Sequence, residues 1–288
     1  MSVPAVFDYH PAKTVDEAIS LLQQYGDEAK VLAGGHSLLP AMKLRLSQPG
    51  HLIDIGRIDS LSYVREEADA IVIGALTTYT TIERSELVRR HFPLMVEATE
   101  LIGDQQVRNR GTIGGSIAHF DPASDMPGVV LALKGQISVQ GPRGTRTISA
   151  DDFFVDSFTT TLEPDEIVTA IRFAKLAGHT GTAYMKLANK ASHYAVTGCA
   201  AVVSLNGDGT CTGASLAITG AALKTTRASA VEAALVGKKL DEQTIAEAAG
   251  HASEGLDVVS DIHGSAEYRR RMTVVMTRRA IEHARERA

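Results

Sequence analysis

Two pairs of adjacent glycines are the residues whose type and setting most directly suggest chemistry. Gly34-Gly35 and Gly114-Gly115 each follow an apolar residue, and a hydroxyl-bearing residue, Ser37 or Ser116, stands close after each pair. Without Cβ atoms, successive amide N–H groups can form a concave nest for phosphate oxygens, to which Thr112 can add a further hydroxyl. A single pair more often only permits a turn, but two such loops together predict a pyrophosphate-binding site.

Neither glycine pair belongs to a common nucleotide-binding motif. The chain contains no Gly-x-x-x-x-Gly-Lys-Ser/Thr loop and no Gly-x-Gly-x-x-Gly fingerprint, which disfavours nucleotide kinases and Rossmann dehydrogenases. Two cysteines cannot supply the four thiolates of an iron–sulfur cluster, and the 10 histidines lack the short spacings of zinc sites. We therefore expect no metal in this chain, so a redox role would need an organic cofactor.

The overall charge and hydropathy exclude two further classes of function. Lys and Arg total 29 against 34 Asp and Glu, a formal charge of −5, which does not fit a protein that binds the phosphate backbone of nucleic acid. No apolar stretch is long enough to span a membrane, and the first residues lack the charged and apolar regions of a signal peptide. We expect a cytoplasmic protein without a membrane span.

The two cysteines flank a predicted β-hairpin. Asn206-Gly-Asp-Gly209 is a turn-rich stretch between two apolar runs that contain Cys199 and Cys211. If the turn centres between Gly207 and Asp208, Cys199 lies opposite Leu216, too far from Cys211 for a disulfide. Both thiols are predicted to be reduced and partly buried.

The elements that must position the glycine pairs alternate between strands and helices. At 288 residues the chain is long enough for two or three domains. The first glycine pair directly follows a short predicted strand. Apolar patterns predict strands at 30–33, 51–55, 70–75, 136–140, 145–148, 166–173, 182–188, 195–205 and 210–219, and helices at 80–90, 94–101, 227–236, 241–253 and 265–286.

The second glycine pair lies in a long polar stretch, residues 103–128, that is rich in Gly, Asp and Pro. We expect this stretch to be an irregular loop, and long irregular segments in compact domains are usually functional. Boundaries between domains are predicted near residues 56 and 177, and after the second boundary strands precede helices, as in an α+β module.

The last predicted helix is strongly basic, with arginines at 269, 270, 271, 278, 279, 285 and 287. Tyr268, Met272, Val275 and Met276 are expected on its packing face. One interpretation is a solvated helix with cations near its C-terminus, and the other is a docking surface for an acidic partner subunit.

The motifs together identify a family resemblance that spans the whole chain. Ala33-Gly-Gly-His-Ser37 and Thr112-Ile-Gly-Gly-Ser116, with Asp121-Pro and Asp125-Met-Pro127, closely resemble the FAD-binding subunits of the molybdenum hydroxylases, the xanthine dehydrogenase and aerobic CO dehydrogenase family. The stretch Leu32-Ala-Gly-Gly-His-Ser-Leu-Leu-Pro40 is most similar to the CO dehydrogenase branch.

The resemblance implies an α+β fold and a site for FAD bound without a covalent link. It implies two N-terminal α/β FAD-binding subdomains of the PCMH type, at 1–55 and 56–177, and a C-terminal domain at 178–288 with a three-stranded antiparallel sheet and a helical bundle. Residues expected around the pyrophosphate are Ala33, Gly34, Gly35, His36, Ser37, Thr112, Ile113, Gly114, Gly115 and Ser116. Asp125 is expected at the ribityl chain, Ile102 and Val168 near the adenine or flavin, and Lys186 and Tyr194 near the isoalloxazine.

One residue departs from the family pattern, and three have other interpretations. Ser116 stands where the family usually has Asn, which keeps a donor but shortens its reach. Asp125 is also compatible with an Asx turn before Pro127, and Lys186 and Tyr194 are also compatible with solvated strand residues.

The resemblance further implies that this chain carries electrons rather than oxidising substrate, so no catalytic residue is expected in it. A large subunit with a molybdenum cofactor would oxidise CO with water to CO2, and a small subunit with [2Fe-2S] clusters would relay electrons to FAD. A quinone would be the acceptor, which would bring the complex to the inner face of the membrane, and the assembly would be a dimer of heterotrimers.

Three alternatives remain open. The complex could act on purines, aldehydes or N-heterocycles, because the large subunit selects the substrate. Gly34-Gly35-His36 also resembles the Gly-Gly-His of free-standing flavin oxidases that link His to flavin. The chain could instead be a non-enzymatic assembly protein whose basic terminal helix binds a partner.

Overall fold

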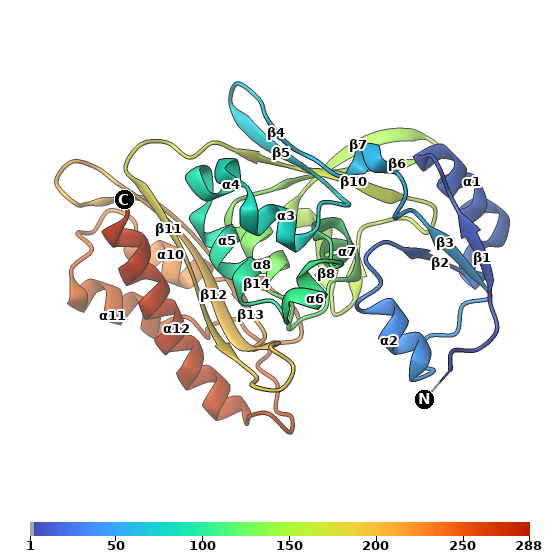
Figure 1. Ribbon diagram of the computed structural model, residues 1–288. Coiled ribbons are helices and arrows are strands. Elements are labelled where there is room, and N and C mark those ends of the chain that lie inside the picture. Colours follow the sequence, from blue (N-terminus) through green and yellow to red (C-terminus); the bar gives the residue numbers. More distant parts are fainter. Residues whose placement is uncertain (1–2) are drawn as a thin grey trace.

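The computed structural model describes residues 3–288 and contains sheets of three, five and four strands, together with a two-stranded ribbon (Figure 1). The three larger sheets follow one another along the chain, each with its own helices. The fold is therefore of the α+β class, as predicted, with a parallel-sheet unit and an antiparallel-sheet unit first and a C-terminal unit of strands followed by helices.

The first sheet is parallel and has the strand order β1 (Asp8–Pro11), β3 (His51–Asp54), β2 (Ala29–Leu32). Helix α1 (Val15–Tyr25) packs against it, starts at the cap residue Thr14 and ends at Gly26, whose φ of 51° favours glycine. The short helices of this part of the chain are η1 (Gly26–Glu28), α2 (Leu38–Lys43) and η2 (Asp59–Leu61). Because β2 ends just before the first glycine pair, the sheet fixes where that loop begins.

The second sheet is antiparallel throughout. Its strand order is β4 (Val64–Glu66), β5 (Ala70–Gly74), β10 (Ile167–Ala174), β6 (Gln136–Gly141), β7 (Gly144–Ser149). The central strand is the last of the five in the sequence, so the sheet closes only when β10 inserts between β5 and β6. Other elements of this unit are α3 (Tyr79–Arg84), α4 (Glu86–His91), α5 (Pro93–Glu100), α6 (Gln105–Arg108), α7 (Ile113–His119), α8 (Met126–Ala132), α9 (Ala150–Phe153), β8 (Phe154–Asp156) and β9 (Thr159–Thr160).

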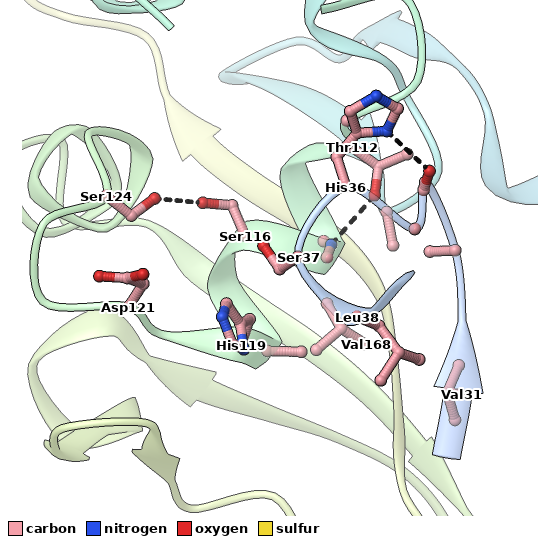
Figure 2. A pocket seen from close by; sticks show the side chains of 18 of the residues that line it. Val31, His36, Ser37, Leu38, Thr112, Ser116, His119, Asp121, Ser124 and Val168 are labelled. Atoms are coloured by element: carbon pink, nitrogen blue, oxygen red, sulfur yellow. Dashed lines mark hydrogen bonds between the residues drawn. The ribbon is translucent and has the colours of Figure 1, made fainter. Parts of the chain in front are cut away.

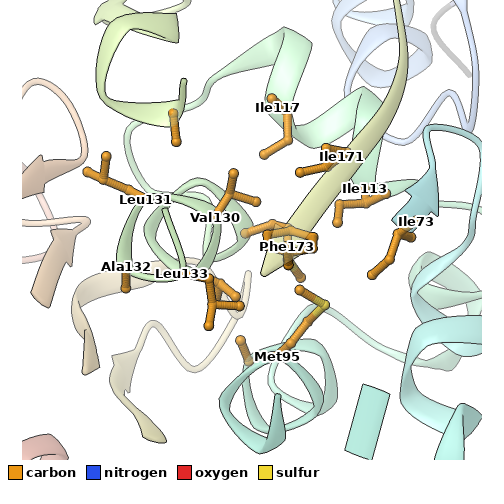
Figure 3. Packing of buried hydrophobic residues seen from close by; sticks show 14 of the residues in the cluster. Ile73, Met95, Ile113, Ile117, Val130, Leu131, Ala132, Leu133, Ile171 and Phe173 are labelled. Carbon is orange, nitrogen blue, oxygen red and sulfur yellow. The ribbon is translucent and has the colours of Figure 1, made fainter. Parts of the chain in front are cut away.

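Helices α5, α7 and α8 cover the second sheet and form the largest core of the molecule (Figure 3). Met95 of α5, Ile113 of α7 and Val130 of α8 are fully buried against Ile73 and Phe173 of the sheet. Burying one such side chain contributes about 1.5–3 kcal/mol relative to leaving it in water. This packing fixes α7, which holds the second glycine pair, and α8, which begins with Met126 and Pro127 of the Asp125-Met-Pro127 motif.

The third sheet is antiparallel and is covered on both faces. Its order is β11 (Thr180–Ala188), β12 (Ala195–Leu205), β13 (Cys211–Thr219), β14 (Thr226–Arg227), so a short fourth strand joins the three that were predicted. The long helix α12 (Ala266–Glu286) lies on one face, and α5 and α8 of the second unit pack on the other (Figure 1). Helices α10 (Ser229–Leu235) and α11 (Glu242–Gly250) complete the unit.

Alternate residues of β12 belong to different cores, as two covered faces require. Ala200 and Val202 pack with the second unit, whereas Cys199, Ala201 and Val203 pack under the C-terminal helices. The near-continuous apolar sequence of this strand is the expected consequence of burial on both faces.

Two predicted segments differ from the structure. The single helix expected over 80–90 is broken at Ser85, whose hydroxyl caps α4 by accepting a hydrogen bond from the Val88 amide (3.3 Å). The stretch 103–128 is not one irregular loop, because α6, α7 and the start of α8 lie within it. Gly, Asp and Pro there separate short helices and begin them, as Asp104 does for α6.

The cysteines are free and buried, as predicted, but the predicted hairpin register is wrong. Cys199 pairs with Ile218, and Leu216 pairs with Ala201. The turn extends over 206–210, with Gly209 at a φ of +82°, which moves the pairing by one residue, and a bulge between Ser204 and Leu205 moves it by one more. Burial raises the pKa of the Cys199 thiol to about 12.

No helix among residues 3–288 is long and apolar enough to cross a membrane. Within the same range, no group of three or more His, Cys, Asp or Glu side chains is arranged to hold a metal ion.

The arginines of α12 mostly have partners within the chain. Arg269 is not solvated, since its guanidinium is buried and donates to the carbonyls of Val196 (2.9 Å) and Gly220 (2.6 Å) and to the carboxylate of Asp261 (2.5 Å). The arginines with further acceptors inside the chain are Arg271, Arg278, Arg285 and Arg287. Arg269 therefore joins the start of α12 to β12 and to the end of β13.

We predict that Arg269→Met lowers the free energy of unfolding by about 3 kcal/mol, because it leaves two buried carbonyls and Asp261 without their donor. The measurement is urea unfolding followed by circular dichroism. Arg278→Met, which removes an exposed i,i+4 pair with Glu282 on the same helix, should change the value by less than about 0.5 kcal/mol. Equal losses in the two variants would contradict the anchoring role of Arg269.

Candidate functional site

A cavity of about 620 Å³ lies where the first unit, the second unit and a loop of the third unit meet. Its wall includes the Gly-rich segment after β2, the first turn of α7, the start of α8, and residues 192–194 from the loop after β11. Figure 2 shows His36 and Ser37 on one side, with Ser116, His119 and Asp121 on the other. The predicted glycine pairs are thus brought together at one site.

The first glycine pair forms the predicted donor-rich loop. Gly35 has a φ of +77°, which turns the chain between β2 and α2. Among the residues that the structure describes, none accepts a hydrogen bond from the backbone amides of residues 34–37. These amides are available to an anionic ligand, because N–H groups in a glycine-rich turn can converge on phosphate oxygens.

Gly34 allows the first two units to come into backbone contact. A Cβ built on Gly34 would overlap the carbonyl oxygen of Arg110 and would lie 3.1 Å from the Cα of Gly111. A Cβ on Gly115 would lie 3.9 Å from the Cβ of Ala33, so the second glycine pair faces the first loop directly. Any larger side chain at Gly34 would force the two walls of the cavity apart.

The second glycine pair is helical, and the nest predicted for it does not exist. Gly114 and Gly115 lie in the first turn of α7. The Gly114 amide donates to the Ala75 carbonyl (2.9 Å), and the Gly115 amide donates to the hydroxyl of Thr112 (3.1 Å). These glycines therefore provide close packing, against Ala75 and towards Ala33, rather than free donors.

Hydroxyl groups line the cavity between the two glycine pairs. The Ser116 hydroxyl is 2.8 Å from that of Ser124, so the shorter side chain at this position bonds within the chain (Figure 2). Tyr194 enters from the third unit and is 41% exposed. Burial raises the pKa of Tyr194, and the Ser37 hydroxyl beside it opposes that rise.

Asp125 of the cavity wall is held by two side chains of the third unit. One carboxylate oxygen accepts from the Tyr184 hydroxyl (2.5 Å) and the other from the Lys186 ammonium (2.7 Å). Its side chain makes no capping bond to α8, so it is not the turn residue of the alternative interpretation. Burial raises the pKa of Asp125, while Lys186 and Tyr184 act in the opposite direction.

The remaining predicted residues divide into two groups. Ile102 and Val168 line the cavity and give it apolar wall. Ile113 lies in the core of the second unit, and Lys186 is fully buried behind Asp125; neither is a lining residue. The interpretation of Lys186 as a solvated strand residue is therefore wrong.

Several lining residues were not singled out as site residues from the sequence. Lys30 lies on β2 next to the first glycine pair, so its place on the strand could have indicated it. Three more lining residues lie between β8 and β10: Phe158, Glu163 and Glu166. No local pattern in the sequence marks them. Glu166 is paired with Arg146 (2.7 Å), which lowers the pKa of Glu166.

Comparison with known proteins gives matches over nearly the whole chain. Residues 5–175 match the FAD binding domain in molybdopterin dehydrogenase, and residues 182–284 match the CO dehydrogenase flavoprotein C-terminal domain. The carbon monoxide dehydrogenase medium chain of Hydrogenophaga pseudoflava is 43% identical over 98% of both chains. Subunit alpha of the 6-hydroxypseudooxynicotine dehydrogenase complex of Paenarthrobacter nicotinovorans is 36% identical over 99% of this chain and 96% of its own. A solved structure of CO dehydrogenase from Oligotropha carboxidovorans has a TM-score of 0.96 at 40% identity, over 99% of this chain and 100% of that chain.

We predict that Gly34→Ala destabilises the protein by about 1–3 kcal/mol, because the new Cβ overlaps the backbone at Arg110 and the two units must separate. The measurement is the free energy of unfolding in urea. Gly207→Ala is the control, since its Cβ would meet nothing within 4 Å, and we expect it to be neutral or to stabilise by up to about 1 kcal/mol. Equal stability of the two variants would show that the contact at Gly34 is not tight.

Proposed function

Because the chain belongs to the family of FAD-binding subunits of molybdopterin dehydrogenases, we propose that it is the flavin-binding, electron-transferring subunit of a three-subunit molybdenum hydroxylase of the CO dehydrogenase type. The observation that carries the proposal is the cavity in which the free amides of residues 34–37 face the second unit. The similarity of the chain to CO dehydrogenase medium chains extends over nearly its whole length, which supports the same role for the whole chain.

The cavity has the properties that FAD requires. Its volume of about 620 Å³ lies within the usual range of ligand pockets, and it has a donor-rich end and an apolar wall. Gly34 and Gly35 permit the close contact with Arg110 and the turn at positive φ, and in this turn the amides of residues 34–37 have no acceptor among the described residues and can bind phosphate oxygens. Acceptors such as Asp125 suit the hydroxyl groups of a ribityl chain.

The residues that would hold FAD follow from this arrangement. We assign the pyrophosphate to the segment Ala33, Gly34, Gly35, His36 and Ser37, whose amides at 34–37 have no protein acceptor, with the segment from Thr112 to Ser116 as the opposite wall that packs against it. The Ser37 hydroxyl adds a donor, and the Ser116 hydroxyl can donate to the ligand when it accepts its hydrogen bond from Ser124. Ile102 and Val168 would pack on the rings, and Tyr194 would cover them from the third unit.

FAD would supply the redox chemistry, and the protein would bind and orient it. When bound, FAD accepts electrons and passes them on, which no side chain of this protein can do. The chain's own residues bind and orient it: the amides of the loop at 33–37 donate hydrogen bonds to the phosphates, Asp125 accepts hydrogen bonds, and Tyr194 limits access of water. The glycine contact at Gly34 fixes the width of the cleft between the first two units.

We further propose the partners and the reaction of the complex. A large molybdenum subunit would convert CO and water to CO2, two protons and two electrons, and a small subunit with [2Fe-2S] clusters would pass the electrons to this chain. A quinone would be the final acceptor, with the complex in the cytoplasm at the inner face of the membrane. The assembly would be a dimer of heterotrimers, and the chain would divide into units at 1–55, 56–177 and 178–288.

A related hydroxylase is the second candidate. Relatives that match the chain over almost its full length include subunits whose names state action on 6-hydroxypseudooxynicotine, nicotine and caffeine. Because the substrate would bind in the large subunit, the cavity described above would serve either enzyme equally. The reaction therefore has to be identified on the purified complex.

We predict that this chain, affinity-purified from its native host under mild conditions, carries about one FAD, about one Mo and about four Fe per chain, the iron corresponding to two [2Fe-2S] clusters. Flavin absorbance and elemental analysis give these values. The same preparation, assayed with CO and a quinone analogue, tests the substrate and the acceptor.

Acid precipitation is the control for the mode of flavin binding. We expect the flavin in the supernatant, whereas flavin pelleted with the protein would indicate a covalent link to His36. FAD without metals would contradict the three-subunit proposal and favour a free-standing flavoprotein, and a preparation without flavin would contradict both.

A further inference from the structure

A buried network of three side chains lies directly behind the cavity wall. Asp125, at the start of α8, bonds to the Tyr184 hydroxyl (2.5 Å) and to the Lys186 ammonium (2.7 Å). The side chains of Lys186 and Asp125 are 0% and 5% exposed, and Tyr184 is also buried. Of the three, only Asp125 lines the cavity.

The two partners of Asp125 come from one strand of the C-terminal unit. Tyr184 and Lys186 are two residues apart on β11, so they point to the same face of the sheet, the face that packs on α5 and α8. Lys186 also donates to the Leu101 carbonyl at the end of α5 (3.1 Å), and the Tyr184 amide donates to the Glu97 carboxylate (2.8 Å). The network thus joins the third unit to the wall of a cavity formed mainly by the first two.

The network leaves Asp125 able to accept further hydrogen bonds. Each carboxylate oxygen can accept about two hydrogen bonds, and the protein supplies one to each. We propose that Tyr184 and Lys186 are positioning residues that hold Asp125 as a fixed, ionised acceptor for a hydroxyl or N–H group of the bound FAD. They act on the ligand only through Asp125. This inference rests on the proposed function.

The groups around Asp125 explain why it needs Lys186. Burial and the like charge of Asp121 raise the pKa of Asp125, whereas Lys186 and Tyr184 lower it. Tyr79 of α3 and Tyr194 are close enough to be affected by the Asp125 charge, but neither carries a positive charge. Lys186 is the cation that lowers the Asp125 pKa most among the groups described, and it bonds to the carboxylate directly (2.7 Å). Without Lys186, burial and the negative charge of Asp121 would keep Asp125 protonated.

The test measures FAD binding to the full chain after removal of its flavin. Binding is followed by the change in flavin fluorescence, which is excited by visible light that the amino-acid side chains do not absorb. We measure the FAD dissociation constant of three variants, Lys186→Met, Tyr184→Phe and Asp125→Asn, from about pH 6.5 to about pH 9. Each constant is divided by the wild-type constant at the same pH. His36, His119 and His193 also line the cavity. Any pH dependence of FAD binding that they cause is the same in the variant and the wild type, so it cancels in the ratio.

The three variants have different expected profiles. For Lys186→Met the ratio rises as the pH falls, by up to about tenfold per pH unit, because a proton must leave Asp125 for FAD to bind. For Asp125→Asn the ratio is about tenfold to hundredfold at every pH, as expected for losing a charged acceptor. For Tyr184→Phe we expect a smaller loss, about threefold to tenfold, since only one positioning hydrogen bond is removed.

Two further variants serve as controls. Lys186→Met with Asp125→Asn buries no unpaired charge, and its ratio should be independent of pH even if the single Lys186→Met chain fails to fold. Lys175→Met removes a cation that is paired with Glu66 (2.7 Å) away from the cavity, and it should bind FAD as the wild type does.

A pH-independent ratio for a folded Lys186→Met chain, or wild-type affinity in Asp125→Asn, would overturn the positioning role while leaving the proposed function intact. If Lys186→Met does not fold, the double variant provides the test. A ratio for the double variant that still rises as the pH falls would overturn the positioning role. A wild-type chain that binds no FAD at any pH would overturn the proposed function, and this inference with it.

Discussion

The contact between Gly34 and the backbone of Arg110 determines the geometry of the N-terminal half. A loop of the first unit and a loop of the second unit meet there without a side chain between them, and the cavity lies beside that contact. The amides of residues 34–37 have no partner among the residues described, and unpaired amides are costly once water is excluded. A ligand with anionic oxygens would satisfy them, so binding would stabilise the contact that creates the site.

The third unit takes part in the site although most of its mass lies away from it. Its sheet is covered by α12 on one face and by α5 and α8 on the other, so β11 carries Lys186 and Tyr184 into the core of the second unit. An ion pair in such a place loses the hydration of both charges, and its attraction offsets that loss only when the geometry is good. The bonds of 2.5 and 2.7 Å to Asp125 meet this condition.

Much of the fold could be predicted from the sequence because its long elements have strong patterns. The apolar run at 195–205 and the helix at 265–286 lie within a residue of β12 and α12. What failed depended on single residues or distant partners: Ser85 divides one helix into two, and a bulge at Ser204 shifts a register. The glycine pairs and Asp125 could be selected from the sequence, but the helical state of Gly114 and the burial of Lys186 depend on contacts formed only in three dimensions.

The charges of the cavity show why it suits a ligand with two different ends. Two of its acids, Asp125 and Glu166, are each paired with a cation that is not itself a lining residue, Lys186 and Arg146. These acids present hydrogen-bond acceptors without a net negative charge of their own, while the loop at 33–37 presents only donors from its amides. A ligand with anionic phosphates and with hydroxyl groups matches both features at once. A simple phosphate ester would use only the donors, and a sugar would use only the acceptors, so the combination favours a nucleotide cofactor such as FAD.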